Sequence, residues 1–191
     1  SPDATTVEST DADTLDSFAS DGFQVDADVK VNTDAEKYVA FCWKAGTTTS
    51  GTTSGSGTGK AYSNSTNTTS GFSITTFIGN GTAGHTIPHH LGSVLHFLIH
   101  KKTSASVDWH SYHHKNTSAP ETDYLYLNLD NATADSAASG WNDTAPTSSV
   151  YAVGTDADLN GNDGTFVSYH WTEKQGFSKF GIYFGNGGAD G

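Results

Sequence analysis

Two stretches of the sequence carry an apolar or aromatic side chain at every second position and end in tryptophan: residues 166–171 (FVSYHW) and residues 38–43 (YVAFCW). Successive side chains of a β-strand point to opposite faces, so both stretches predict strands. In each predicted strand three large side chains share one face, and we assign these two faces to the core. The residues concerned are Val39, Phe41 and Trp43 in the first strand, and Val167, Tyr169 and Trp171 in the second.

The two stretches are the ends of a longer internal repeat. A shift of 128 positions (151 minus 23) places residues 23–43 on residues 151–171 without a gap, and Asp28 then falls on Asp156. Each copy is followed by Gly-Phe-Ser and an aromatic segment that ends in Gly-Asn-Gly. The pattern predicts a repeated β-meander of strand, turn, strand, loop and strand. The Gly-Phe-Ser to Gly-Asn-Gly segments are residues 71–81 and 176–187.

Composition supports an all-β fold. Ser and Thr supply 49 residues, Gly supplies 21, and aromatic residues make up 12% of the chain. Such residues favour strands and turns over helices, and we find no convincing apolar period of 3.6 residues. Two repeats that face each other predict a two-sheet antiparallel β-sandwich, jelly-roll-like, with an internal pseudo-duplication. We expect residues 1–20 to form an N-terminal arm or linker and residues 21–191 to form the sandwich.

Charge and residue usage exclude several classes of function. The net charge is −12 and the chain contains no Arg, which predicts no nucleic-acid partner because phosphates require clustered cations. The longest apolar run, residues 94–99, is too short for a membrane helix, so we expect no membrane insertion. The single cysteine, Cys42, excludes an intrachain disulfide and a cysteine-based zinc site. Neither G-x-S-x-G nor H-E-x-x-H is present, and we predict that the chain is not an enzyme.

One motif resembles half of a calcium-binding loop. Asp156, Asp158 and Asn160 alternate before Gly161, so their oxygens could converge on one cation. The bidentate Glu expected six residues after that Gly is missing, because position 167 is Val. Solvation of a hairpin turn and a weak calcium site are both compatible with the motif. The nine histidines lack chelating spacing within single strands, and we predict no tightly bound transition metal and no cofactor.

Six N-x-S/T sequons could accept N-linked glycans in a secreted protein, or could simply form Asn/Thr turns. They are Asn64, Asn67, Asn80, Asn116, Asn131 and Asn142. Aromatic residues could form a sugar-stacking platform, although aromatic residues on strands more often pack in a core. The residues considered for that platform are Trp109, Trp141, Tyr112, Tyr124 and Tyr126.

The order of motifs along the chain resembles an uncharacterised domain of bacteriophage tail-fibre and structural proteins. The resemblance covers roughly residues 15–191, and it departs at Leu95-His96, where the family pattern tends to have Pro-Lys. It implies a sandwich like that of concanavalin-like lectins, and a structural or adhesive role without established catalytic residues. The motifs that carry it are residues 17–25, 38–46, 71–84, 89–92, 141–144 and 176–181.

These observations lead to a structural function with one alternative. We expect a subunit of an extracellular fibre, filament or virion appendage that assembles with copies of itself, with the N-terminal segment completing a neighbour's sheet. The segment expected to be exchanged is residues 22–32, with Phe23, Val25, Val29 and Val31 as the assembly residues. The alternative is a carbohydrate-binding, lectin-like module with glycans as partners. Both functions place the protein outside the cell or on a virion surface.

Overall fold

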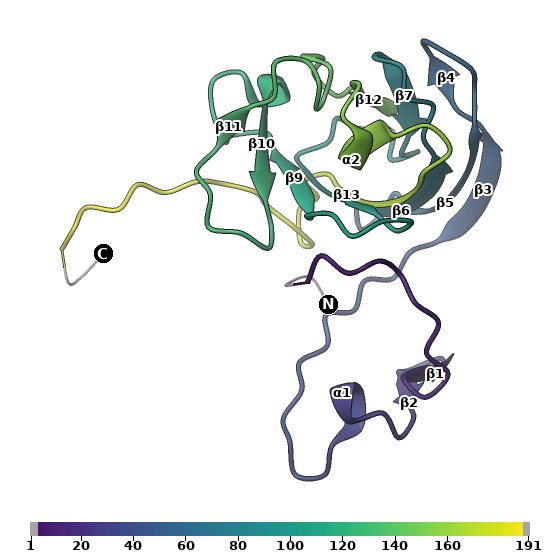
Figure 1. Cartoon of the computed structure of the whole chain (residues 1–191). Coiled ribbons are helices and arrows are strands. Elements are labelled where there is room, and N and C mark those ends of the chain that lie inside the picture. The colour runs from purple at the N-terminus through teal and green to yellow at the C-terminus, as the bar shows by residue number, and fades with distance from the viewer. Residues whose placement is uncertain (1–3, 189–191) are drawn as a thin grey trace. The chain divides into compact units, whose positions relative to one another are not determined.

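The computed structural model describes residues 4–188, and its strands belong to two compact units (Figure 1). One unit contains residues 44–191 together with the first seven residues, and the other is Glu8–Trp43. The expected boundary between an arm (residues 1–20) and a sandwich (residues 21–191) stays a prediction. The two compact units have their boundaries at Glu8 and Lys44. No helix in the described part of the chain is long and apolar enough to cross a membrane.

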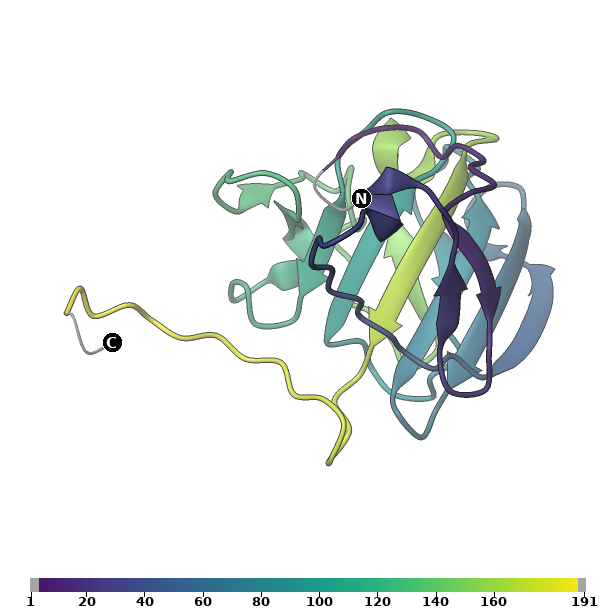
Figure 2. The same ribbon diagram turned by 90° about the horizontal axis from the view of Figure 1, so that it is seen from below.

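The larger unit contains an antiparallel sheet of eight strands, in the order β11-β10-β9-β8-β13-β6-β5-β3. Figure 2 shows this sheet with β13, in yellow-green, running through its middle. Seven consecutive residues of β13 pair with β6, from Thr165↔Ile78 to Trp171↔Phe72. The strands are β3 (Thr47–Thr52), β5 (Ala61–Asn67), β6 (Phe72–Ile78), β8 (Phe97–Lys102), β9 (His110–His113), β10 (Asp123–Tyr126), β11 (Ala134–Asp135) and β13 (Thr165–Trp171).

A smaller antiparallel sheet has the order β12-β7-β4, with β4 at Ser54–Gly55, β7 at His85–Pro88 and β12 at Val150–Val153. Two short helical elements lie in the connections, η1 (Pro120–Thr122) and α2 (Ala157–Asn160). Neither sheet closes into a barrel, so the predicted all-β, sandwich-like, antiparallel fold is confirmed.

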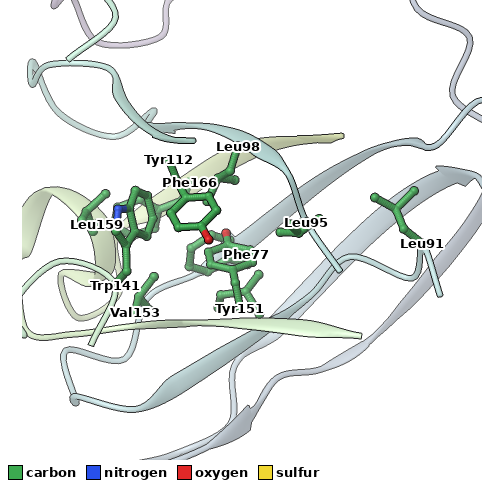
Figure 3. Packing of buried hydrophobic residues seen from close by; sticks show 11 residues of the cluster. Phe77, Leu91, Leu95, Leu98, Tyr112, Trp141, Tyr151, Val153, Leu159 and Phe166 are labelled. Carbon is green, nitrogen blue, oxygen red and sulfur yellow. The ribbon is translucent and has the colours of Figure 1, made fainter. Parts of the chain in front are cut away.

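The core contains side chains from both sheets and from the loops between them (Figure 3). Phe77 and Phe166 stack within the large sheet, with ring centroids 5.0 Å apart. Ile87 and Tyr151 come from the small sheet, while Trp141 and other residues come from loops. The buried cluster is Phe77, Ile87, Leu91, Leu95, Leu98, Tyr112, Trp141, Tyr151, Val153, Leu159 and Phe166.

For most of β13, the face that enters the core is the opposite of the one predicted. Phe166, Ser168 and His170 are buried, and Val167 and Tyr169 are half-buried. Trp171, at the end of the strand, is buried as predicted. Ser168 can occupy the core because its Oγ bonds the Tyr151 hydroxyl at 2.7 Å and His100 Nδ1 at 2.9 Å. Buried polar groups with such partners avoid the cost of losing water.

The smaller unit contains a hairpin of β1 (Leu15–Phe18) and β2 (Phe23–Val25), followed by α1 (Val29–Asn32). The strand predicted for residues 38–43 is wrong, because this stretch is irregular and exposed. Val39 and Phe41 are 81% and 77% exposed, and Trp43 is 52% exposed, so this face lies outside any core. The aromatic strand predicted after Gly176 is also wrong, because residues 179–187 are irregular and mostly exposed.

Candidate functional site

The four predicted assembly residues divide between a strand and a helical turn. Phe23 and Val25 lie on β2, which pairs with β1 of the same chain. Val29 and Val31 lie on α1, so the continuous strand expected over residues 22–32 ends at Val25. Phe23 and Val29 are exposed at 42% and 73%, which leaves their apolar surface open to a partner.

Aspartate side chains explain why each repeat turns into a helix after its first strand. Asp28 caps α1 by accepting the Lys30 N–H at 2.6 Å, and Asp156 caps α2 by accepting the Asp158 N–H at 2.8 Å. Asp at the N-cap satisfies N–H groups that the first helical turn leaves unpaired. The two aspartates are equivalent in the repeat, so the duplication is structural from the first strand through the helical turn.

The calcium motif folds into the capped turn α2. Asp156 uses its carboxylate on the Asp158 N–H. The Asn160 side chain is fully buried, and its Oδ1 accepts the Asn80 N–H at 3.1 Å and lies 2.8 Å from His85 Nδ1. Asn160 therefore does not join the two aspartates around a cation, because its oxygen already serves the interior.

Burial separates the six sequons. Asn64 is 1% exposed and its amide donates to Thr75 Oγ1 at 2.7 Å. Asn80 is 9% exposed and its amide donates to the carbonyls of Ser56 and Thr58. A glycan on either amide would break these contacts in the folded protein. Asn67, Asn116 and Asn142 are half-buried, and Asn131 is exposed.

The aromatic platform considered for sugars is not formed by all its predicted members. Trp141 and Tyr112 are 2% and 5% exposed and belong to the core. Trp109 donates its indole N–H to the Ala4 carbonyl at 3.0 Å and lies under the Lys101 ammonium. Tyr124 and Tyr126 are half-buried and pack on His110.

A cluster that the sequence analysis missed forms at one end of three neighbouring strands, where β8 begins and β9 and β13 end. Ligand atoms of His96, His114 and Glu173 lie within 4.8 Å of one another. The three residues are spread over the sequence, and only the pairing of β8 with β9 and β13 brings them together. Burial lowers the pKa of His96, and the Phe180 backbone N–H holds the pKa of Glu173 below its usual range.

The hydrogen bonds of this cluster fix the segment that follows β13. Glu173 Oε1 accepts the Phe180 N–H at 3.1 Å, and His114 Nε2 lies 3.3 Å from the Phe180 carbonyl. His96 Nδ1 accepts the Glu173 N–H at 3.1 Å, so the neutral ring carries its proton on Nε2. A metal ion could bind His96 only if it displaced the Glu173 N–H from Nδ1 or the proton from Nε2. The geometry therefore favours anchoring of the C-terminal segment over metal binding.

Large exposed apolar side chains gather in two segments outside the sandwich. Residues 38–43 carry Val39 and Phe41, and residues 177–184 carry Phe177, which is 63% exposed. Isolated apolar residues on a surface are ordinary, but gathered ones mark interaction sites. The other exposed members are Tyr38 and Trp43 in the first segment and Ile182, Tyr183 and Phe184 in the second.

Comparisons with known proteins give a family without an assigned activity. The model of one protein family, described as a domain of unknown function (DUF7483), matches residues 1–191. That description carries no statement about phages or lectins. Neither the curated proteins nor the solved structures contain a match to this chain.

Proposed function

The chain belongs to the family of the domain of unknown function DUF7483, and on that premise we propose that it is a structural subunit that assembles with copies of itself. The assembly is an extracellular fibre, filament or virion appendage, built head to tail. The single observation that carries the proposal is the exposed apolar surface of the N-terminal unit.

The sequence of Glu8–Trp43 is too rich in exposed apolar groups for a linker that touches only water. On the hairpin, Phe18 is 81% exposed and Phe23 is 42% exposed, and Val29 on α1 is 73% exposed. Each apolar side chain of this size gains about 1.5–3 kcal/mol when it is buried. A second copy that covers Phe23, Val25, Val29 and Val31 would recover this free energy.

The hairpin also supplies main-chain groups for assembly. β1 and β2 form a sheet of two strands, which presents unpaired edges along both strands. Such edges are templates for strand addition by another chain. A contact between two different surfaces repeats from subunit to subunit, and it builds an open fibre when the rotation does not close a ring.

The test compares two valine variants of the full chain by negative-stain microscopy and light scattering. We expect the unmodified protein to form fibres, and Val29→Asp to abolish them because it places a charge in the buried contact. Val94→Asp is the matched control, because Val94 is also exposed, at 49%, but lies in the larger unit. Its fibres should persist.

Two results would reject the proposal. One is a monodisperse monomer at every concentration, and binding of that monomer to a glycan array would support a lectin-like module instead. The other is equal loss of fibres in both variants while circular dichroism shows intact folding, since the N-terminal unit would then have no special role.

A further inference from the structure

The repeat assigns a strand partner to each of the two exposed apolar segments. Residues 38–43 are equivalent to 166–171, which form most of β13, and residues 176–178 are equivalent to 71–73, where β6 begins. β13 and β6 are direct neighbours in the eight-stranded sheet. The structure thus contains one copy of the β13–β6 pair and, outside the sheet, the sequence equivalents of both its strands.

We propose that residues 38–43 of one copy pair as an antiparallel strand with residues 177–184 of a second copy. This inference rests on the proposed function, because it names the two surfaces that meet in the assembly.

Near Trp43, the register of the proposed strand pair follows directly from the observed β13–β6 pair. Trp171 pairs with Phe72, and His170 pairs with Ser73. A shift of 128 for the first strand and of 105 (176 minus 71) for the second places Trp43 opposite Phe177 and Cys42 opposite Ser178. Toward the other end one extra residue near Gly181 must form a bulge, after which Tyr183 is equivalent to Phe77.

Pairing would bury the side chains that are now in water. Val39 and Phe41 are 81% and 77% exposed, whereas their equivalents Val167 and Tyr169 are half-buried. Tyr183 is 92% exposed, whereas its equivalent Phe77 is 3% exposed. The pattern of large side chains therefore fits a paired strand better than the irregular chain that each segment adopts alone.

The large sheet holds the chain next to each segment, but its β13–β6 pair leaves no free strand edge for either of them. The chain before β3 is held by the Asn67 amide, which donates to the Lys44 carbonyl at 3.1 Å. The C-terminal segment is held beside β8, where Phe180 stacks on Phe97 with ring centroids 5.6 Å apart. β13 pairs with β6 and β8, and β6 pairs with β13 and β5, so within one chain neither segment can take its equivalent's place in that pair, and a second copy supplies the missing partner.

Cys42 makes the register directly testable, because it is the single cysteine of the chain and is exposed. At the equivalent position of the observed pair, Ser73 Oγ and His170 Nδ1 are 3.1 Å apart. In Ser178→Cys the introduced thiol should therefore face Cys42 of a neighbouring copy. Under a mild oxidant the two thiols lose two electrons and two protons to that oxidant and form one disulfide.

We expect oxidised Ser178→Cys to give a ladder of multimers on a non-reducing gel, which a reductant converts back to monomer. Gln175→Cys is the matched control, because Gln175 is exposed and lies just before the same segment, outside the register. A double variant carries both Cys42→Ser and Ser178→Cys. When it is mixed with the unmodified chain, a disulfide between positions 42 and 178 can form only between two different copies. Mass spectrometry should find the peptide of residue 42 joined to the peptide of residue 178.

The outcomes separate the pairing from the assembly itself. A disulfide within single chains, or equal cross-linking of Gln175→Cys, would overturn the pairing. Fibres of the unmodified protein without a link between positions 42 and 178 would overturn the pairing and leave the structural function standing. If the unmodified protein stays monomeric and Ser178→Cys forms no disulfide between positions 42 and 178, both the pairing and the structural function are overturned.

Discussion

Histidine side chains occupy the interior of the sandwich in the neutral form. His100 Nδ1 bonds Ser168 Oγ, and His170 Nδ1 bonds Ser73 Oγ at 3.1 Å. His89 Nδ1 accepts the Leu91 N–H at 3.3 Å, which requires an unprotonated nitrogen. Burial lowers the pKa of His89 to about 4 and of His100 to about 3. The buried histidines are His85, His89, His100, His110 and His170.

We expect acid to destabilise the fold through these histidines. Their pKa values lie below the ordinary 6.5 in the folded chain, so the unfolded chain binds more protons as the pH falls below 6.5. Stability is therefore complete above about pH 6.5 and is lost progressively toward pH 4 and below. For His89, the fall of its pKa from 6.5 to about 4 corresponds to roughly 3 kcal/mol.

Urea unfolding between pH 7.5 and pH 4.5 measures this loss. His89→Gln keeps a polar side chain without a titrating ring, so the free energy of unfolding should fall less steeply with pH in this variant. His90→Gln is the matched control, because His90 is the adjacent histidine and is exposed. A free energy of unfolding that is flat from pH 7 to pH 5 would contradict the expectation.

At the level of secondary-structure elements, the equivalent parts of the repeat differ in what they pack against. β12 and α2 lie in the sandwich, where Leu159 and Asn160 are fully buried. β2 and α1 have the same order and the same aspartate cap, but α1 contains no buried residue. The local sequence makes the helical turn in both copies, while tertiary contacts stabilise only α2 against the sandwich.

Removal of the cap should therefore have a measurable effect at α2. We expect Asp156→Ala to lower the free energy of unfolding by about 1 kcal/mol, because the Asp158 N–H loses its acceptor. Asp156→Asn should retain most of the stability, since its side-chain oxygen can still accept that N–H. Urea unfolding measures both variants, and equal losses for Ala and Asn would show that the cap is not the cause.

At the scale of the whole molecule, two tryptophans report on the two compact units. Trp141 is 2% exposed and lies in the core with Tyr112 and Tyr151. Trp43 is 52% exposed and belongs to Glu8–Trp43, where it stacks on Phe41. The equivalence of Trp43 with Trp171 in the repeat does not give it an equivalent environment.

Replacement of these two tryptophans should change the free energy of unfolding of the larger unit by different amounts. We expect Trp141→Ala to cost about 3–5 kcal/mol, through lost burial and the cavity left behind. Trp43→Ala should change the stability of the sandwich by less than about 1 kcal/mol, because its surface is largely exposed. Far-UV circular dichroism during urea unfolding follows the strands, and similar losses for both variants would contradict this division.

The sequence by itself determined the fold class and the local chemistry. Alternation in residues 166–171 and the richness in Thr, Ser, Gly and aromatics were enough for an antiparallel all-β fold. The repeat correctly placed Asp28 opposite Asp156, because an N-cap is a contact between residues close in sequence. The helical turns themselves were missed, since one turn is too short to show an apolar period.

Only the tertiary structure decided which face of each strand is buried. Period two separates Val167 and Tyr169 from Ser168 and His170, but hydrophobicity alone selects the wrong pair. Ser168 enters the core because Tyr151 and His100, from other strands, supply its hydrogen bonds. The cluster of His96, His114 and Glu173 likewise exists only after three strands have paired. Such partners are distant in sequence, and local patterns carry no information about which of them will meet.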